Sequence, residues 1–177
     1  MKAFTKRGYR LSDAAVDVKI AYTGFLAFAL VGYATLLLIA LLRVGPGYDA
    51  IVTHYRGSEL EEAAFPRTFG QLLEDAHFHA FIEGVVLLVL AHLFAATSVS
   101  GRLKGWVILA AFGATFTDLA CPWLIRYAAP QFAVLQQASW ATIGASAALL
   151  IGVPIYDMWF RPRPPHLQPK RVRERKE

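Results

Sequence analysis

Histidines and carboxylates gather in one apolar segment of this chain. Residues 74–92 hold three of the five histidines together with three carboxylates: Glu74, Asp75, His77, His79, Glu83 and His92. Ionisable groups at membrane depth cost roughly 2.5–3.5 kcal/mol each on insertion scales, so such groups usually mark function. Neutral imidazole can coordinate haem or a metal ion there without burying a charge. We therefore take this segment as the candidate site.

Haem b is the first ligand to consider, because histidines on transmembrane helices are its usual axial ligands. His77 and His92 lie about 22 Å apart along a helix, a separation that could serve two stacked haems. A two-haem bundle needs opposing histidines, and the predicted fourth span contains none. One haem with a single histidine, or with a ligand from another subunit, stays open. The candidate cofactor-binding residues are His77, His79, His92, Trp123 and Arg126.

A metal ion is the second candidate, since imidazole nitrogen and carboxylate oxygen suit zinc, copper and non-haem iron. The candidate metal ligands are Asp75, His77, His79, Glu83 and His92. His77 and His79 cannot share one face of a regular helix, so both could bind one ion only if the start of the helix is distorted. The spacing of Asp75, His79 and His92 resembles the metal-binding motif of the third subunit of the particulate methane and ammonia monooxygenases. This resemblance implies a membrane metal-binding protein with oxygenase-like chemistry.

A quinone is the third candidate, because it needs a histidine or an acid for proton exchange and aromatic walls around its ring. Phe78, Phe81, Trp123 and Tyr127 could form such walls near the outer leaflet. Aromatic side chains are also expected there as the interfacial belt of any membrane protein. The aromatic residues alone therefore do not separate a quinone site from an ordinary membrane boundary.

The predicted third span carries Asp118 and Arg126 at heights where they could meet Glu83. An arginine–carboxylate pair would reduce the insertion cost of both groups. The three residues therefore predict either part of a functional site or a purely structural polar clasp.

Four apolar stretches, each long enough to cross a bilayer, must position these residues. The chain has 177 residues, of which 56% are hydrophobic, and this is a membrane composition. About 20 apolar residues span a bilayer, and such runs predict spans at about 18–43, 76–100, 104–127 and 132–158. We expect an all-α fold, a four-helix transmembrane bundle in residues 1–160, followed by a basic cytoplasmic tail at 161–177. The single cysteine excludes a covalently attached c-type haem.

Basic residues predict the orientation of the bundle. The first ten residues contain four Lys or Arg, the second connection contains Arg102 and Lys104, and the tail contains seven Lys or Arg against two Glu. The loop at 44–75 is acidic instead. We expect a multi-pass protein of the bacterial inner membrane with both termini cytoplasmic. In the outer loop, 48–55 is expected to be a short interfacial helix, and Pro66 is expected to start a helical stretch at 67–75 that runs into the second span.

Several segments resemble a group of uncharacterised four-span bacterial inner-membrane proteins. They are 55–57 (YRG), 72–81 (LLEDAHFHAF), 91–94 (AHLF) and 118–127 (DLACPWLIRY). The resemblance covers most of the chain and implies the four-span fold, but it implies no particular reaction.

Together these features predict an integral subunit of a bacterial electron-transfer complex with a haem or quinone site near the periplasmic side. The alternatives are a membrane protein that binds copper, zinc or iron, and a non-catalytic scaffold subunit. Membrane lipids and the protein subunits of a larger complex are the expected partners, and nucleic acid is not. The absence of a nucleophile–base set, a phosphate loop or a nucleotide motif argues against a hydrolase or an ATPase.

Overall fold

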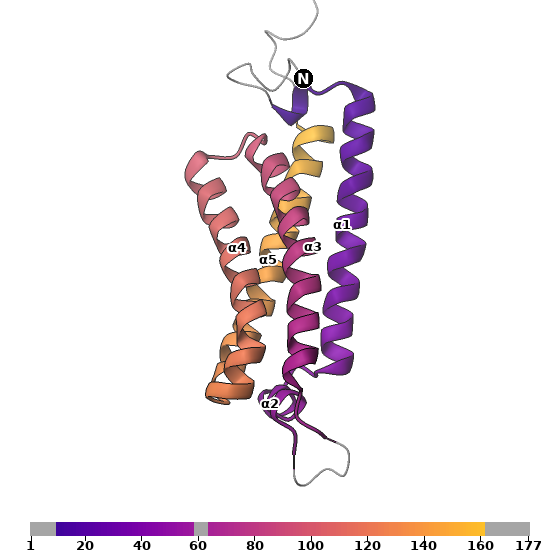
Figure 1. Cartoon of the computed structure of the whole chain (residues 1–177). Coiled ribbons are helices and arrows are strands. Elements are labelled where there is room, and N and C mark those ends of the chain that lie inside the picture. The colour runs from indigo at the N-terminus through magenta and orange to yellow at the C-terminus, as the bar shows by residue number, and fades with distance from the viewer. Residues whose placement is uncertain (1–9, 59–63, 162–177) are drawn as a thin grey trace, which may run out of the picture.

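The computed structural model describes residues 10–58 and 64–161, and this part of the chain contains helices but no strand. The elements are the short 3-10 turn η1 (Leu11–Asp13), α1 (Val16–Arg43), α2 (Tyr48–Arg56), α3 (Phe69–Ala95), α4 (Gly101–Trp123), the π-helical turn η2 (Leu124–Ala128) and α5 (Phe132–Trp159). The long helices α1, α3, α4 and α5 form one bundle (Figure 1). Each is long and apolar enough to cross a membrane, with η2 extending the third span. The predicted all-α transmembrane bundle is confirmed.

The two ends of the bundle carry different elements. Helix α1 begins and α5 finishes at one end, which we call the terminal end, whereas α2 lies at the opposite end, the α2 end (Figure 1). At the terminal end, Lys19 Nζ donates a hydrogen bond to Met158 O (2.7 Å). At the α2 end, Gln137 Nε2 donates to Pro46 O (2.6 Å). These contacts join α1 and the connection after it to α5.

Helix α3 begins and ends earlier than the span predicted at 76–100. A reciprocal cap starts it, because Thr68 Oγ1 accepts from Gln71 N (3.3 Å) and Gln71 Oε1 accepts from Thr68 N (3.0 Å). The helical stretch predicted at 67–75 is the first part of α3 and continues into the span, as the sequence predicted. At its other end, Lys104 Nζ donates to Ala95 O (2.8 Å) and thereby satisfies one of the last carbonyls of the helix.

Two hydrophobic clusters hold the bundle together. The cluster toward the terminal end includes Leu26, Leu90, Phe94, Ala111 and Leu150. The cluster at the α2 end includes Ile51, Leu72, Cys121, Ile125 and Ala133. Helix α1 is the peripheral member, because 6% of its apolar window is buried against 28–33% in the other three spans. It therefore depends more than the others on polar contacts for its position.

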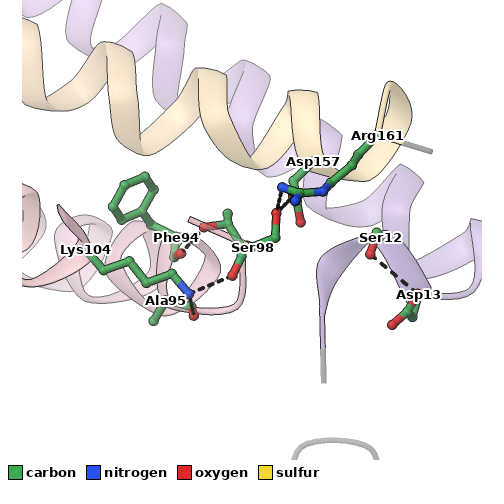
Figure 2. A network of polar contacts seen from close by, with 9 residues as sticks. Ser12, Asp13, Phe94, Ala95, Ser98, Lys104, Asp157 and Arg161 are labelled. Carbon is green, nitrogen blue, oxygen red and sulfur yellow. Dashed lines mark hydrogen bonds and ion pairs between the residues drawn. The ribbon is translucent and has the colours of Figure 1, made fainter. Parts of the chain in front are cut away.

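A polar network closes the terminal end (Figure 2). The carboxylate of Asp157, which is buried, accepts from Ser98 Oγ in the turn between α3 and α4. Arg161 Nη1 also donates to Ser98 Oγ and lies 3.3 Å from Asp157 Oδ1. These bonds fix the end of α5 against the α3–α4 turn.

Buried Lys19 attaches α1 to the same end. Its Nζ donates to Ser12 O (2.8 Å) in addition to Met158 O. Trp159 Nε1 donates to Thr23 Oγ1 (2.9 Å) and adds a second link between α5 and α1. The start of α1 is thus tethered through hydrogen bonds, whereas its second half borders an internal space.

Candidate functional site

A cavity of about 390 Å³ lies between the second half of α1 and the other three long helices. Most of its wall is apolar and comes from α1 residues between Leu30 and Val44 and from α5 residues between Ile143 and Ile151. The polar side chains in its wall include His54, Tyr55, Arg67, Asp75, His79, Asp118, Gln136 and Trp140. An apolar cavity with a few converging polar groups is the usual form of a small-molecule site.

His79 and Glu83 form the first polar pair at this cavity. One helical turn separates them on α3, and His79 Nδ1 lies 2.9 Å from Glu83 Oε1. Because an ionised carboxylate only accepts, Nδ1 carries the proton and Nε2 of the neutral ring is left as an acceptor. His79 Nε2 makes no hydrogen bond with any residue that the structure describes.

Asp118 and Gln136 form the second polar pair, and it joins α4 to α5. Gln136 Nε2 donates to Asp118 Oδ1, and the Ser139 hydroxyl lies 3.4 Å from the same oxygen. Gln136 is almost fully buried, and its Oε1 has no hydrogen-bond partner among the described residues. A buried amide oxygen without a partner is costly, so it marks a place where a ligand donor would be stabilised.

Polar residues at the α2 end close the cavity toward the aqueous side. Arg67 Nε donates to His54 Nε2 (3.3 Å), and Arg67 Nη2 lies 3.9 Å from Asp75 Oδ2. Burial lowers the pKa of His54, and the positive charge of Arg67 lowers it further, so the ring stays neutral and accepts from Arg67. Burial raises the pKa of Tyr55, which therefore keeps its hydroxyl proton.

A second, aqueous-side cavity of about 720 Å³ adjoins the first. Both cavities are lined by Arg43, Val44, His54 and Arg67, so these residues form the boundary between the two. Polar side chains such as Asp49, Thr53 and Gln71 line the rest of the outer cavity. The inner cavity is thus mainly apolar and the outer one mainly polar.

The π-helical turn η2 shapes the α2 end of α4. Pro122 lies inside α4 and cannot donate a backbone hydrogen bond, which loosens the helix locally. The wider turn is closed by Ala129 N donating to Leu124 O (2.9 Å). Arg56 Nη1 donates to Ile125 O (3.1 Å), and Arg126 Nε donates to Arg67 O (3.1 Å). These bonds fix α2 and the start of α3 against η2.

The predicted polar clasp is not formed as one unit. Glu83 is joined to His79, and Asp118 is joined to Gln136 and Ser139 of α5. Arg126 bonds the backbone of Arg67 and makes no ion pair with a described residue. The reason is that α5 supplies the side chains that contact Asp118, whereas the prediction looked for the partners of Asp118 on α3.

The other predicted site residues divide between the cavity and the exterior. Trp123 and Asp75 line the cavity beside His79. His77 and His92 are exposed on the outside of α3. The predicted quinone walls Phe78, Phe81 and Tyr127 are also exposed. In residues 10–58 and 64–161, no three His, Cys, Asp or Glu side chains lie close enough together to hold a metal ion.

Several cavity residues were missed by the sequence interpretation. They are His54, Tyr55, Arg67, Gln136 and Trp140, together with Ser139, whose hydroxyl contacts the cavity residue Asp118. Gln136 and Ser139 are three residues apart in a mostly apolar span, so they share one helix face, and this spacing was the available signal. The residues of α2 and Arg67 carried no such signal, because only the folding of the outer loop places them over the cavity.

The comparisons with known proteins support the membrane fold. No curated protein and no solved structure matches the chain. Residues 45–165, which are more than half of the chain, match a family described as a transmembrane helical domain. This match and the four apolar helices confirm the predicted resemblance to an uncharacterised membrane protein family. The chain belongs to the Aq_1264_TM family of transmembrane helical domains.

Proposed function

We propose that the protein is an integral subunit of a bacterial electron-transfer complex and that it binds a quinol in the cavity beside α1. The observation that carries this proposal is the pair of acceptor atoms without partners in two residues that line the cavity: His79 Nε2, and Gln136 Oε1, which is buried and becomes accessible to a ligand when the Gln136 amide turns toward the cavity. A quinol ring carries two hydroxyl donors and an apolar tail. The two acceptors suit the hydroxyls, and the long apolar wall of α1 and α5 suits the tail.

The chemistry of the polar wall also fits quinol oxidation. Oxidation of a quinol breaks both O–H bonds and releases two electrons and two protons. Neutral His79 can take one proton at Nε2, because the Glu83 carboxylate beside Nδ1 stabilises the imidazolium that forms. The second proton can leave toward the outer cavity past the boundary residues, with the carboxylate of Asp75, which lines the inner cavity beside Arg67, as its first acceptor. The electrons pass to a redox cofactor elsewhere in the complex.

Haem and metal ions are less well supported as occupants of this cavity. His54 and His79 are the histidines in its wall. His54 Nε2 accepts from Arg67, and the same ring bonds the backbone carbonyl of Arg43, so neither of its nitrogens is available to iron. One imidazole in an enclosed wall is a poor ligand set for a metal ion.

Quinol binding is tested on the purified protein in lipid nanodiscs. Decylubiquinol and oxidised decylubiquinone are titrated while tryptophan fluorescence is recorded, since Trp123 and Trp140 line the cavity. We expect saturable quenching, tighter for the quinol, and a loss of at least about tenfold in affinity in His79→Ala, the effect of one good hydrogen bond.

The matched control for this titration is His77→Ala, an exposed histidine two residues away on the same helix. It should bind quinol as the unmodified protein does. Equal affinities in His79→Ala, His77→Ala and the unmodified protein would exclude the site.

The proposal places the protein in the inner membrane with both termini in the cytoplasm. It is supported by the four spans and by the basic residues of the first ten positions, the second connection and the tail. Phosphatase and fluorescent-protein reporters fused after Glu62 and after Arg163 test this orientation. We expect phosphatase activity only at Glu62 and fluorescence only at Arg163, and two fusions on the same side would exclude it.

A further inference from the structure

Asp118 is a carboxylate at the inner cavity without a positively charged partner. It lies in the third span, and the groups that donate hydrogen bonds to it, Gln136 Nε2 and the Trp140 side chain, are neutral. The His79 ring also interacts with Asp118 electrostatically, but its Nδ1 is bound to Glu83 (2.9 Å). No ion pair joins Asp118 to a Lys, Arg or His that the structure describes. Carboxylates at membrane depth usually pair with a cation or line a substrate pathway, so a cationic ligand would be stabilised here.

The charges around Asp118 also favour a cation over an anion. Glu83 of α3 is near enough to repel Asp118 electrostatically, so the two carboxylates add to one negative potential. Arg43 and Arg67 line the outer cavity as well as the inner one, so they lie at the boundary between the two. Arg67 lies 3.9 Å from Asp75, and Arg43 is exposed. Neither arginine therefore neutralises Asp118.

The rest of the cavity wall suits an organic cation better than a metal ion. The aromatic side chains of Tyr33, Trp123 and Trp140 line it, and the faces of aromatic rings attract cations. Aliphatic side chains of α1 and α5 form most of the remaining wall and can cover a hydrocarbon body. A volume of about 390 Å³ is that of a small-molecule site. A metal ion would need more ligands, and no group of three His, Cys, Asp or Glu that could hold one occurs in the described ranges 10–58 and 64–161.

Gln136 indicates that the cation carries N–H donors. It lines the cavity, is 2% exposed and donates its amide N–H to Asp118, whereas its Oε1 has no hydrogen-bond partner among the described residues. A buried amide oxygen without a partner is costly, and a ligand donor removes that cost when the amide turns toward the cavity. A protonated primary amine has three N–H donors. One ammonium group can therefore donate to both the Asp118 carboxylate and Gln136 Oε1.

We propose that the inner cavity binds a protonated amphiphilic amine. Its ammonium group donates to the Asp118 carboxylate and to Gln136 Oε1, and its hydrocarbon body packs against α1 and α5. The inference goes beyond quinol binding and does not rest on it, because the quinol is recognised through His79 and needs no negative charge. The two ligands occupy one cavity and therefore exclude each other.

The test uses the full chain in nanodiscs of phosphatidylcholine, a lipid without net charge, and no quinol is added. The probes are phenylbutylamine, which is protonated at neutral pH, and phenylbutanol, which is neutral and has nearly the same size and shape. Binding is followed by tryptophan fluorescence, since Trp123 and Trp140 line the cavity, and empty nanodiscs correct for partition into lipid. We expect saturable quenching by the amine and an affinity at least about tenfold above that of the alcohol.

Variants of Asp118 separate the effect of charge from that of packing. Asp118→Asn keeps an oxygen that accepts from Gln136 but removes the charge, so its amine affinity should fall at least about tenfold while its alcohol affinity stays unchanged. Asp118→Glu keeps the charge and should still bind the amine. Asp49→Asn is the matched control, because it removes one carboxylate from the outer cavity and should bind the amine as the unmodified protein does.

Three results would each overturn the proposal. They are equal affinities for phenylbutylamine and phenylbutanol, full amine affinity in Asp118→Asn, and an equal loss in Asp118→Asn and Asp49→Asn, which would attribute binding to the overall charge of the protein. Phenylbutyltrimethylammonium has the charge without an N–H donor and should bind more weakly than the amine, and equal binding would overturn the role of Gln136. The quinol titration is decided through His79, so the failure of one proposal leaves the other intact.

Discussion

His79 and Glu83 are joined by a contact of 2.9 Å between Nδ1 and Oε1 on successive turns of α3. Glu83 is buried, whereas His79 is partly exposed and lines the cavity. The carboxylate therefore fixes the imidazole ring on the side away from the cavity. The pair leaves Nε2 as an acceptor toward the cavity, and this direction depends on the charge of Glu83.

Replacing Glu83 should therefore change the preference between quinol and quinone. Glu83→Leu frees the ring to carry its proton on Nε2, which opposes a quinol hydroxyl and suits a quinone carbonyl. We expect quinol affinity to fall at least about tenfold in Glu83→Leu and less in Glu83→Gln, which keeps an acceptor for Nδ1–H. Titration with decylubiquinol and with decylubiquinone measures the ratio of the two affinities. An unchanged ratio in Glu83→Leu would contradict this role of Glu83.

His54 should make the stability of the α2 end dependent on pH. Burial and Arg67 hold its pKa below the usual value, and Asp75 opposes this shift in part. The unfolded chain therefore binds the proton more tightly than the folded one. Stability is complete above the unfolded pKa of about 6.5 and is lost as the pH falls through it toward the folded pKa.

The measurement is thermal unfolding of the purified protein between about pH 8 and about pH 5, a range that extends from above to below the unfolded pKa of about 6.5. His54→Gln is the matched variant, because its amide oxygen can accept from Arg67 without titrating. The melting temperature of the unmodified protein should fall relative to His54→Gln as the pH decreases. Parallel profiles would show that His54 does not titrate during unfolding.

Asp118 should stabilise the packing of α4 against α5. Asp118→Leu leaves the buried Gln136 Nε2 without its acceptor, and this should cost about 1–3 kcal/mol of unfolding free energy. Asp118→Asn retains an acceptor oxygen and should lose less. Thr117→Val is the control, since the Thr117 hydroxyl bonds Gly113 O of its own helix (2.8 Å). Reversible unfolding in mixed micelles gives the unfolding free energies of the three variants. An equal loss of unfolding free energy in Asp118→Leu and Thr117→Val would argue against a stabilising contact between Asp118 and Gln136.

Lys19 should control how firmly the start of α1 is held. Lys19→Met removes the donor to Ser12 O and Met158 O, and the rest of α1 buries little surface. We expect faster hydrogen exchange in the first turns of α1 and no change in α3, α4 or α5. Thr35→Val serves as the comparison, because Thr35 bonds carbonyls within its own helix. Identical exchange in Lys19→Met and the unmodified protein would show that the tether is dispensable.

The four-helix bundle could be predicted from the sequence because lipid satisfies no backbone hydrogen bond. Every apolar run of span length must therefore become a helix, and α1, α3, α4 and α5 follow this rule. The helix predicted at 48–55 appears as α2 for a local reason as well, since Gly45, Pro46 and Gly47 interrupt the preceding span. The helical stretch predicted from 67 into the second span appears as the start of α3, where Thr68 and Gln71 form the cap ahead of the apolar run.

The sequence by itself determined the chemistry that the site can use, since its histidines, carboxylates and amides are visible in the spans. Only the tertiary structure decided which of them meet. Helical periodicity predicts a side chain's direction about its own axis but not which helix stands opposite, and that depends on packing over the whole bundle. This packing joins Asp118 to Gln136, turns His79 toward the cavity and leaves His92 outside. The outer loop folds His54 and Arg67 over the cavity for the same reason, through contacts between residues far apart in the chain.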